Sequence, residues 1–182
     1  IASAPWEQDM AFCVKKVTGG EVSGTLCDIK EEASVEVFSP LGVFVLPKQH
    51  KHIAFIAVGT GIAPFRGMIR ELFEKHYNKT GEDTSSKIDV LFGARIGEEV
   101  IYEEEFTTLA QDKENFNYMV TLTREEQEGK LQGRVQTHLD KLELDEESIV
   151  YICGVNEMVL EVKKQLLSKG LSQRQLHVEL YG

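Results

Sequence analysis

Hydrophobic and polar positions change their rhythm along the chain close to residue 53. After that point, short apolar runs alternate with longer segments whose apolar residues recur at every third or fourth position. Continuous short runs are typical of buried parallel strands, and the longer periodic segments are typical of amphipathic helices. The pattern predicts strands at residues 53–58, 88–93, 117–122, 149–153 and 176–180. It predicts helices at residues 64–77, 102–110, 133–142 and 156–169, with Gly170 placed to end the last one.

Strands that alternate with helices predict a particular class of fold. We expect an α/β domain with an open, five-stranded, mostly parallel sheet and helices on both faces, as in Rossmann-like nucleotide domains. Residues 48–52 are polar and favour a linker. Residues 78–87 are rich in Thr, Ser and Gly, which favours a solvated loop.

The first 47 residues have a different pattern, with β character. Strand candidates lie at residues 10–17 and 34–38 and, after a turn, within 40–47, and residues 23–29 favour a short helix capped by Ser23. We therefore expect an incomplete antiparallel β-barrel segment at residues 1–50, followed by a nucleotide domain at residues 51–182. So short a β segment cannot close a barrel, which favours a chain that is part of a longer protein.

Composition narrows the class of partner. The chain has 42% hydrophobic and 27% charged residues and a net charge of −10, and both predicted parts are acidic. An acidic balance argues against nucleic acid as a partner, and no apolar run approaches the roughly 18–20 residues that a membrane span needs. The three cysteines, Cys13, Cys27 and Cys153, are too far apart in sequence for a metal motif and favour a reducing compartment. We expect a location in the cytoplasm, or in an organelle stroma in a eukaryote, and no metal site.

The most informative stretch is the junction between the first buried strand and its helix. Gly59-Thr60-Gly61 ends an apolar run, and Ile62-Ala63-Pro64 opens the predicted helix. Glycines allow tight turns and close approach of a ligand, proline suits the first helical turn, and free N–H groups there attract anions. The segment predicts a phosphate site, most simply for a dinucleotide, although an ordinary tight strand-to-helix turn has the same pattern.

Four motifs in order resemble one family. They are Gly-Thr-Gly-Ile-Ala-Pro-Phe-Arg at 59–66, Thr-Leu-Thr-Arg-Glu-Glu at 121–126 with Gly-Arg at 133–134, Cys-Gly at 153–154, and His-Val-Glu-Leu-Tyr at 177–181. Together they resemble the nucleotide domain of the ferredoxin–NADP reductase family, across essentially the whole chain. The resemblance implies FAD and NADP as cofactors and an electron-carrier protein, ferredoxin or flavodoxin, as partner.

The resemblance also implies roles for individual residues in nucleotide binding. The 59–64 turn would hold the pyrophosphate. Arg95 would lie beside the nucleotide, and Arg124 and Arg134 are expected at its 2′-phosphate. Thr123 and Lys130 are further candidates for nucleotide binding. Arginine supports that role because its planar, always-charged fork pairs with phosphate in two places. Glu125 and Glu126 stand beside these cations, so selection of NAD and simple surface ion pairing stay open.

Three residues are expected at the reacting ring. In relatives, a thiol at the place of Cys153 lies against the nicotinamide. Gly154 would let the backbone pass close to the ring, and Met158, which continues the resemblance, is a further cofactor-binding candidate. Glu179 would lie near the transferred hydride, and Tyr181 would stack on the flavin until the nicotinamide displaces it. Gly182 extends the chain one residue past the usual family ending. We treat Cys153, Glu179 and Tyr181 as the candidate catalytic residues.

Flavin binding has a weaker basis in this chain. Ile1, Ala2 and Ser3 resemble the segment that follows the Arg-x-Tyr-Ser flavin motif of the family, but that motif itself is not in the sequence. The segment Val22-Ser23-Gly24-Thr25 resembles the element that faces the FAD pyrophosphate.

The predicted function is a flavin-dependent oxidoreductase that transfers hydride between NADPH and FAD. Two alternatives stay open: an NADH-dependent reductase component of an oxygenase system, and a nucleotide-binding module without flavin. The sequence leaves the electron partner, the direction of electron flow and the oligomeric state open.

Overall fold

The carboxyl-terminal three quarters of the chain build one parallel sheet. The structure is a computed structural model that describes residues 1–38, 42–48, 50–76 and 86–181. Six strands lie in the order β4-β3-β2-β1-β5-β6, and every neighbouring pair is parallel. The strands are β1 (His52–Val58), β2 (Lys87–Ala94), β3 (Phe116–Leu122), β4 (Leu131–Gln132), β5 (Ser148–Gly154) and β6 (Leu176–Leu180).

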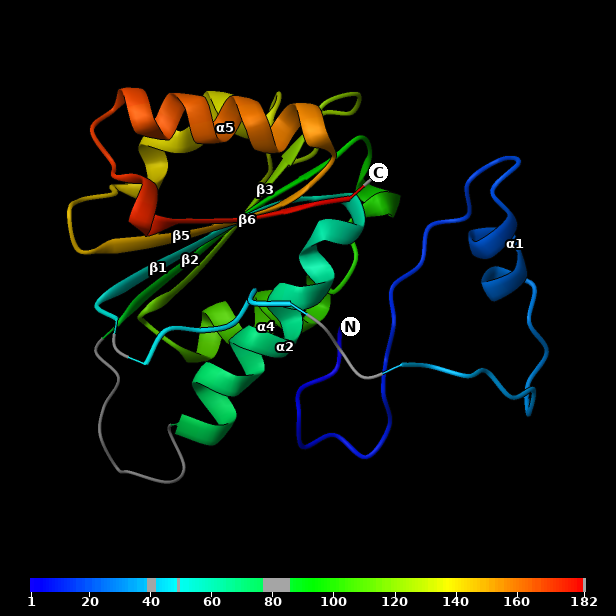
Figure 1. Ribbon diagram of the computed structural model, residues 1–182. Coiled ribbons are helices and arrows are strands. Elements are labelled where there is room, and N and C mark those ends of the chain that lie inside the picture. Colours follow the sequence, from blue (N-terminus) through cyan, green and yellow to red (C-terminus); the bar gives the residue numbers. More distant parts are fainter. Residues whose placement is uncertain (39–41, 49, 77–85, 182) are drawn as a thin grey trace.

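Helices cover both faces of this sheet (Figure 1). One face carries α2 (Ala63–Arg70), which continues into the π-helical turn η2 (Glu71–His76), and α4 (Glu103–Asp112). The other carries α5 (Asn156–Ser168) and the 3₁₀ segment η4 (Val135–Leu142). The remaining 3₁₀ turns are η1 (Gly59–Ile62), η3 (Gly97–Glu99) and η5 (Gln173–Gln175). Among the described residues, no helix has the length and apolar character needed to cross a membrane.

The two helical layers explain why the strands are apolar throughout. On the α2 and α4 side, Phe55 packs on Phe65 and Phe106 packs on Phe116, and all four rings are buried. On the other side, Ile56 and Ile152 pack against Val159 of α5. A strand buried on both faces has no polar face, so it reads as a continuous hydrophobic run.

The prediction of an α/β nucleotide-type fold is confirmed, with two corrections to the sheet. It has six strands rather than five, and it is wholly parallel. The additional strand β4 is two residues long, too short to give a hydrophobic pattern. Residues 133–142, predicted as a helix, form one only from Val135, and it is 3₁₀ in type. The predicted end of the 64–77 helix and most of the predicted 78–87 loop lie outside the described residues, and Gly170 takes the expected positive φ, of 101°.

The antiparallel barrel segment expected at the start of the chain is wrong. Residues 1–38 and 42–48 contain no strand, and their one helix is α1 (Glu21–Cys27), which begins two residues before Ser23. Strand backbones need a hydrogen-bonding neighbour on at least one side, and this segment pairs with none of the described strands. Its alternating apolar residues are accordingly exposed, as at Phe12 and Val37. Residues 40 and 41, in the turn predicted before the third strand, lie outside the described residues.

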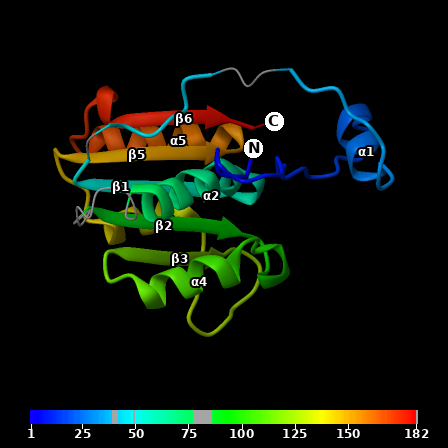
Figure 2. The ribbon, with the colours of Figure 1, turned by 90° about the horizontal axis from the view of Figure 1, so that it is seen from below.

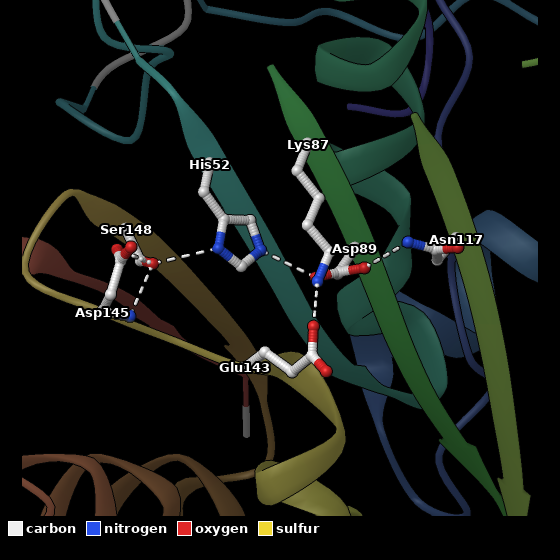
Figure 3. Close-up of polar contacts among 7 residues, drawn as sticks. All are labelled: His52, Lys87, Asp89, Asn117, Glu143, Asp145 and Ser148. Atoms are coloured by element: carbon white, nitrogen blue, oxygen red, sulfur yellow. Dashed lines mark hydrogen bonds and ion pairs between the residues drawn. The ribbon is translucent and has the colours of Figure 1, made fainter. Parts of the chain in front are cut away.

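A buried polar cluster aligns the strands at the amino end of the sheet (Figure 3). His52 of β1 contacts Asp89 of β2 through Nε2 at 2.7 Å and Ser148 of β5 through Nδ1 at 3.0 Å. Asn117 of β3 donates to Asp89 at 2.8 Å. These side chains join four adjacent strands within the first three residues of each, at the edge of the sheet opposite the carboxyl ends.

Both termini lie on the carboxyl side of the sheet. Figure 2 shows the arrowheads of the strands, the first residues and the end of the chain on the same side, with α1 standing beyond them. Residues 44 and 45 return to the sheet, where the Tyr151 hydroxyl donates to the Val45 carbonyl at 2.7 Å and Phe44 packs edge-on against the Tyr151 ring.

Candidate functional site

The order of the strands reverses between β1 and β5, and this is where the predicted nucleotide residues meet. The chain runs from β1 outward to β2, β3 and β4, then returns to place β5 on the other side of β1. In open parallel sheets, ligands bind in the crevice outside the carboxyl ends of the strands at such a reversal. The turn at Gly59–Ile62 follows β1, and Cys153 and Gly154 end β5.

The two turns at this reversal are in direct contact. A Cβ on Gly61 would overlap the backbone carbonyl of Cys153, so no larger residue fits between them. Gly59 has a φ of 55°, a conformation that favours glycine, and open space lies where its side chain would be. Pro64 stands in the first turn of α2, which continues directly from η1, and the N–H of Ala63 donates to the Thr60 carbonyl. The N–H groups without a partner inside this helical segment are therefore those at the start of η1. A bare backbone turn under open space, leading into a helix, fits the pyrophosphate of a dinucleotide.

The catalytic candidates are brought together by pairing between β5 and β6. Cys153 is the register partner of Glu179, and Gly154 is the partner of Leu180. The backbone N–H of Tyr181 donates to the Gly154 carbonyl at 2.8 Å, which extends the pairing past the end of β6. The Tyr181 ring packs at the edge of the core, where its hydroxyl and the Cys153 thiol affect each other's pKa.

The protonation states at this edge follow from burial. Burial, with a contribution from the negative charge of Glu179, raises the pKa of the Cys153 thiol to about 12. Burial also raises the pKa of Tyr181, and the neighbouring Cys153 and Glu179 raise it further. Both groups are therefore neutral at pH 7, and the protonated thiol is not a nucleophile.

Gly154 packs closely against Met158 and Val58, next to Cys153. Gly154 has a φ of 151°, and a Cβ there would lie 2.6 Å from Cγ2 of Val58 and 2.8 Å from Cε of Met158. Met158 is itself 5% exposed. The backbone of Gly154 can therefore lie flush with the neighbouring side chains, which leaves room for a flat ring against the end of β5.

Arg95 and Arg124 lie on adjacent turns at the ends of β2 and β3. The backbone N–H of Arg124 donates to the Arg95 carbonyl at 2.8 Å, and that of Thr123 donates to the Ala94 carbonyl at 3.1 Å. Glu125 accepts a hydrogen bond from the Gly97 N–H at 2.6 Å, which ties the two turns together. These contacts fix where the two arginines leave the backbone.

Two of the cationic side chains predicted to bind the nucleotide are already paired with carboxylates. Arg95 donates from Nε to Glu99 at 2.8 Å, and its guanidinium forms an ion pair with the same carboxylate. Lys130 forms an ion pair with Glu103 and is nearly buried. These carboxylate partners were not expected from the sequence, although the acidic run at 98–105 is a signal for them.

Arg134 lies between β4 and η4. It precedes η4, and Gly133 before it is held to β3 by two bonds, from its N–H to the Leu122 carbonyl and from Thr121 Oγ1 to its own carbonyl. Arg124 and Arg134 are both exposed, and neither side chain has an ion pair within the described part of the chain.

The predicted flavin residues are divided between two places. Ala2 and Ser3 lie against α2, where a Cβ on Gly67 would come within 2.9 Å of the Ser3 carbonyl oxygen. Residues 22–25 lie in α1, away from the sheet in both views (Figures 1 and 2). Ser23 accepts a hydrogen bond from the Val17 N–H at 3.1 Å and does not cap the helix, and Thr25 bonds the Glu21 carbonyl.

Comparison with known proteins identifies the group to which this arrangement belongs. Residues 55–164 match the family described as "Oxidoreductase NAD-binding domain". A "Ferredoxin--NADP reductase B" from Sorangium cellulosum is 32% identical over 193 residues, and the match covers all of this chain and 76% of that protein. This chain belongs to the ferredoxin–NADP reductase family of NAD-binding oxidoreductases.

Other members of the family cover a wider range of names and lengths. The root isozyme 2 ferredoxin–NADP reductase of Arabidopsis thaliana is 30% identical, with 89% of this chain and 48% of that protein covered. The "Anthranilate 1,2-dioxygenase electron transfer component" of Acinetobacter baylyi is 26% identical, with 94% and 49% covered. This chain spans about half the length of these two ferredoxin–NADP reductase family members.

Solved structures of the family have the same fold. A ferredoxin NADP+ reductase from Neisseria gonorrhoeae, solved with bound FAD and NADP, superimposes with a TM-score of 0.80 over 99% of this chain and 77% of that one, at 19% identity. The FAD/NAD-binding domain of a Vibrio cholerae nitric oxide dioxygenase gives a TM-score of 0.72 at 26% identity, covering 90% of this chain and 65% of that one.

Within the described residues of this chain, no group of three or more His, Cys, Asp or Glu side chains could hold a metal ion.

Proposed function

We propose that this chain takes part in hydride transfer between NADPH and FAD, with electrons passing to or from a carrier protein such as ferredoxin or flavodoxin. The observation that carries the proposal is the contact between the Gly59–Ile62 turn and the end of β5, with Cys153, Glu179 and Tyr181 at the same edge. A turn suited to phosphate and a surface suited to a flat ring would stand side by side there. When bound at this edge, NADPH would supply a hydride and FAD would accept it.

The chain's own residues would bind and orient the two cofactors. The 59–64 turn offers backbone N–H groups to the pyrophosphate. The protonated thiol of Cys153 gives the nicotinamide a close, uncharged contact, and Gly154 leaves space for the ring. Tyr181, which is held beside Cys153 and Gly154 by its backbone bond, would cover this place, so nicotinamide binding would require the Tyr181 ring to move.

We propose NADPH as the preferred donor because two exposed arginines flank the end of the sheet. Arg124 and Arg134 follow β3 and β4, and neither is neutralised by an ion pair among the described residues. A 2′-phosphate would find two fixed positive charges there, with Thr123 beside them. Arg95 and Lys130 would add to this site after release from Glu99 and Glu103.

A second candidate is an NADH-dependent reductase of an oxygenase system. The observation that favours it is the pairing of Arg95 with Glu99 and of Lys130 with Glu103, which neutralises two of the four cations expected to bind the nucleotide. A carboxylate beside the ribose favours NADH through its 2′-hydroxyl. The similarity to a dioxygenase electron transfer component agrees with this reading.

For the flavin side, we propose that residues 1–3 contact the isoalloxazine and that residues 22–25 face the FAD pyrophosphate. We also propose a division of the chain into a flavin part at 1–50 and a nucleotide part at 51–182. The close packing of Ser3 on Gly67 would bring the flavin to the start of α2, beside the nucleotide turn.

The experiment that tests the proposal is anaerobic reduction of FAD. Purified protein is supplied with FAD, mixed with NADPH or with NADH, and the flavin absorbance is followed. Fast bleaching with NADPH and slow bleaching with NADH supports the proposal, and the reverse order supports the second candidate. If the protein binds NADP+ but FAD stays free and oxidised, the chain acts as a nucleotide module without flavin and the proposal fails.

A further inference from the structure

A pair of arginines on α2 holds the first residues of the chain. Arg66 and Arg70 are one helical turn apart, so both side chains leave the same face of α2. Arg70 forms an ion pair with Oε1 of Glu7, and NH1 of Arg66 lies 3.5 Å from Oε2 of the same carboxylate. The two side chains are mostly buried, with 16% of Arg66 and 24% of Arg70 exposed.

Arg66 also reaches two other parts of the molecule. Its NH1 donates to the carbonyl of Ala2 at 3.0 Å, and its Nε donates to Glu105 of α4 at 2.7 Å. The guanidinium lies over the Tyr102 ring, 5.4 Å from its centre. One side chain therefore joins the first residues of the chain to α2 and α4.

Glu7, which binds both arginines, also holds the backbone of the amino-terminal segment at Ala4. Its Oε2 accepts a hydrogen bond from the Ala4 N–H, and the Glu7 N–H returns one to the Ala4 carbonyl. The backbone bond from Ala4, together with the charges of Arg70 and Arg66, holds the pKa of Glu7 below its usual range, although burial opposes this. Glu7 is therefore an anion at neutral pH, and its charge binds both arginines.

The segment held in this way continues directly into the predicted flavin contacts. Ala2 donates its N–H to the Ala11 carbonyl at 2.8 Å, and Ser3 accepts one from the Ala11 N–H at 3.1 Å. Ala2 is 1% exposed, and Gly67 leaves no gap between α2 and the Ser3 carbonyl. Residues 1–3 are thus held against α2 at Gly67, within one helical turn of the end of α2 that is proposed to bind the nucleotide.

We propose that Arg66 and Glu7 are positioning residues, which set the approach of the flavin segment to the nucleotide turn. The inference rests on the proposed function, because it requires residues 1–3 to contact FAD and the 59–64 turn to contact NADPH. Arg66 and Glu7 act through residues 1–3 and α2. Their role is to hold the two cofactor sites at the separation that hydride transfer needs, since small errors in such a distance lower rates steeply.

The test compares Glu7→Gln with the unaltered full-length protein. Glutamine keeps the size of the side chain but removes the charge that binds the two arginines. The matched control is Glu147→Gln, which removes the ion pair with Lys51 at the amino end of the sheet. Arg66→Lys and Arg66→Ala form a second pair of variants. Lysine keeps the positive charge but loses the planar guanidinium, which donates hydrogen bonds in several directions.

Three readouts separate positioning from simple loss of structure. We expect Glu7→Gln to increase hydrogen exchange of the amides of residues 2–11, to leave the NADP+ dissociation constant within about twofold, and to slow anaerobic FAD reduction about tenfold or more. Arg66→Ala should have a larger effect on rate than Arg66→Lys. The Glu147→Gln control should match the unaltered protein in all three.

Two results overturn the inference. If the backbone amides of residues 2–11 exchange hydrogen no faster in Glu7→Gln and Arg66→Ala than in the unaltered protein, Glu7 and Arg66 do not hold this segment. If exchange rises while the rate of FAD reduction stays the same, the segment does not position the flavin. Failure of the unaltered protein to reduce FAD would instead contradict the proposed function and the positioning role with it, while the exchange data still decide whether the two residues hold the segment.

Discussion

Cys153 and Glu179 are register partners on the parallel strands β5 and β6, and the backbone N–H of Tyr181, two residues after Glu179, donates to the Gly154 carbonyl at 2.8 Å. Three residues from two distant parts of the sequence are therefore held at one point by backbone pairing. The point lies where the strand order reverses, next to the Gly59–Ile62 turn. The following predictions depend on this arrangement and on the contacts that support it.

The thiol of Cys153 should resist alkylation in the folded protein. Its side chain is fully buried and its pKa is raised to about 12, so almost no thiolate exists at pH 8. Cys27 is exposed and serves as the internal control. Brief treatment with iodoacetamide at pH 8, followed by peptide mass spectrometry, should show modification of Cys27 and none of Cys153. Equal modification of both would contradict the burial of the thiol.

Charge reversal of Arg124 should change the choice of nucleotide. In Arg124→Glu, we expect the KM for NADPH to rise about tenfold or more, because a charge-assisted pair with the 2′-phosphate becomes a repulsion. The KM for NADH should change little. Steady-state kinetics with both donors give the ratio, and an unchanged KM for NADPH in Arg124→Glu combined with Arg134→Glu would show that the 2′-phosphate binds elsewhere.

Removal of the Glu99 charge should have the opposite effect. Glu99 holds Arg95 through an i,i+4 ion pair and a hydrogen bond to Nε. In Glu99→Gln the guanidinium becomes available to a 2′-phosphate, so titration calorimetry should show tighter binding of NADP+ and unchanged binding of NAD+. Weaker binding of NADP+ would mean that Glu99 orients Arg95 for the phosphate rather than competing with it.

Gly61 should tolerate no side chain. A Cβ there would overlap the Cys153 carbonyl, and relief of that overlap requires movement of β5 against β1. Gly61→Ala should lower the free energy of unfolding by about 1–3 kcal/mol. Gly24→Ala is a contrasting variant, because nothing lies within 4 Å of its added methyl and alanine favours a helix by about 0.5–1 kcal/mol. Urea denaturation that ranks Gly61→Ala as the more stable variant would rule out the contact.

The buried cluster at the other end of the sheet should dominate stability without affecting the site. Asp89 accepts from His52 and Asn117 (Figure 3), and Asp89→Ala leaves both without that partner. We expect a loss of about 1–3 kcal/mol in the free energy of unfolding. Nucleotide affinity should stay the same wherever the protein remains folded, since the site lies at the opposite edge.

Acid should weaken the contact between Glu7 and α2. Because the pKa of Glu7 in the folded protein is lowered from 4.5, its contribution to stability is complete above pH 4.5 and disappears as the pH falls through the folded value. The difference in unfolding free energy between the unaltered protein and Glu7→Gln should be constant from pH 6 to 8 and decrease below about pH 4.5. A difference that grows on acidification would have the wrong sign.

The nucleotide part of the fold could be predicted because its strands are buried on both faces. All five predicted strands are present, and residues 176–180 match β6 at both ends. The pattern failed where tertiary contacts decide the structure. β4 consists of two residues held by the end of β3, and the expected strands before residue 48 lack partners among the described residues.

The candidate site divides in the same way. Residues of local motifs, such as the 59–64 turn and the Cys153-Gly154 pair, could be predicted from sequence because their spacing is short. The ion pairs of Lys130 with Glu103 and of Arg66 with Glu7 join side chains 27 and 59 positions apart. No periodicity encodes such contacts, since they depend on how the elements pack.

The most direct test of the account is the anaerobic reduction of FAD by NADPH that carries deuterium at the transferred position of the nicotinamide. The account predicts that the deuterated donor bleaches the flavin more slowly than the unlabelled one, and that Cys153→Ser slows the reaction while leaving NADP+ binding close to normal. Flavin that is not reduced, or a rate unaffected by both the label and the substitution, would contradict hydride transfer at the end of β5.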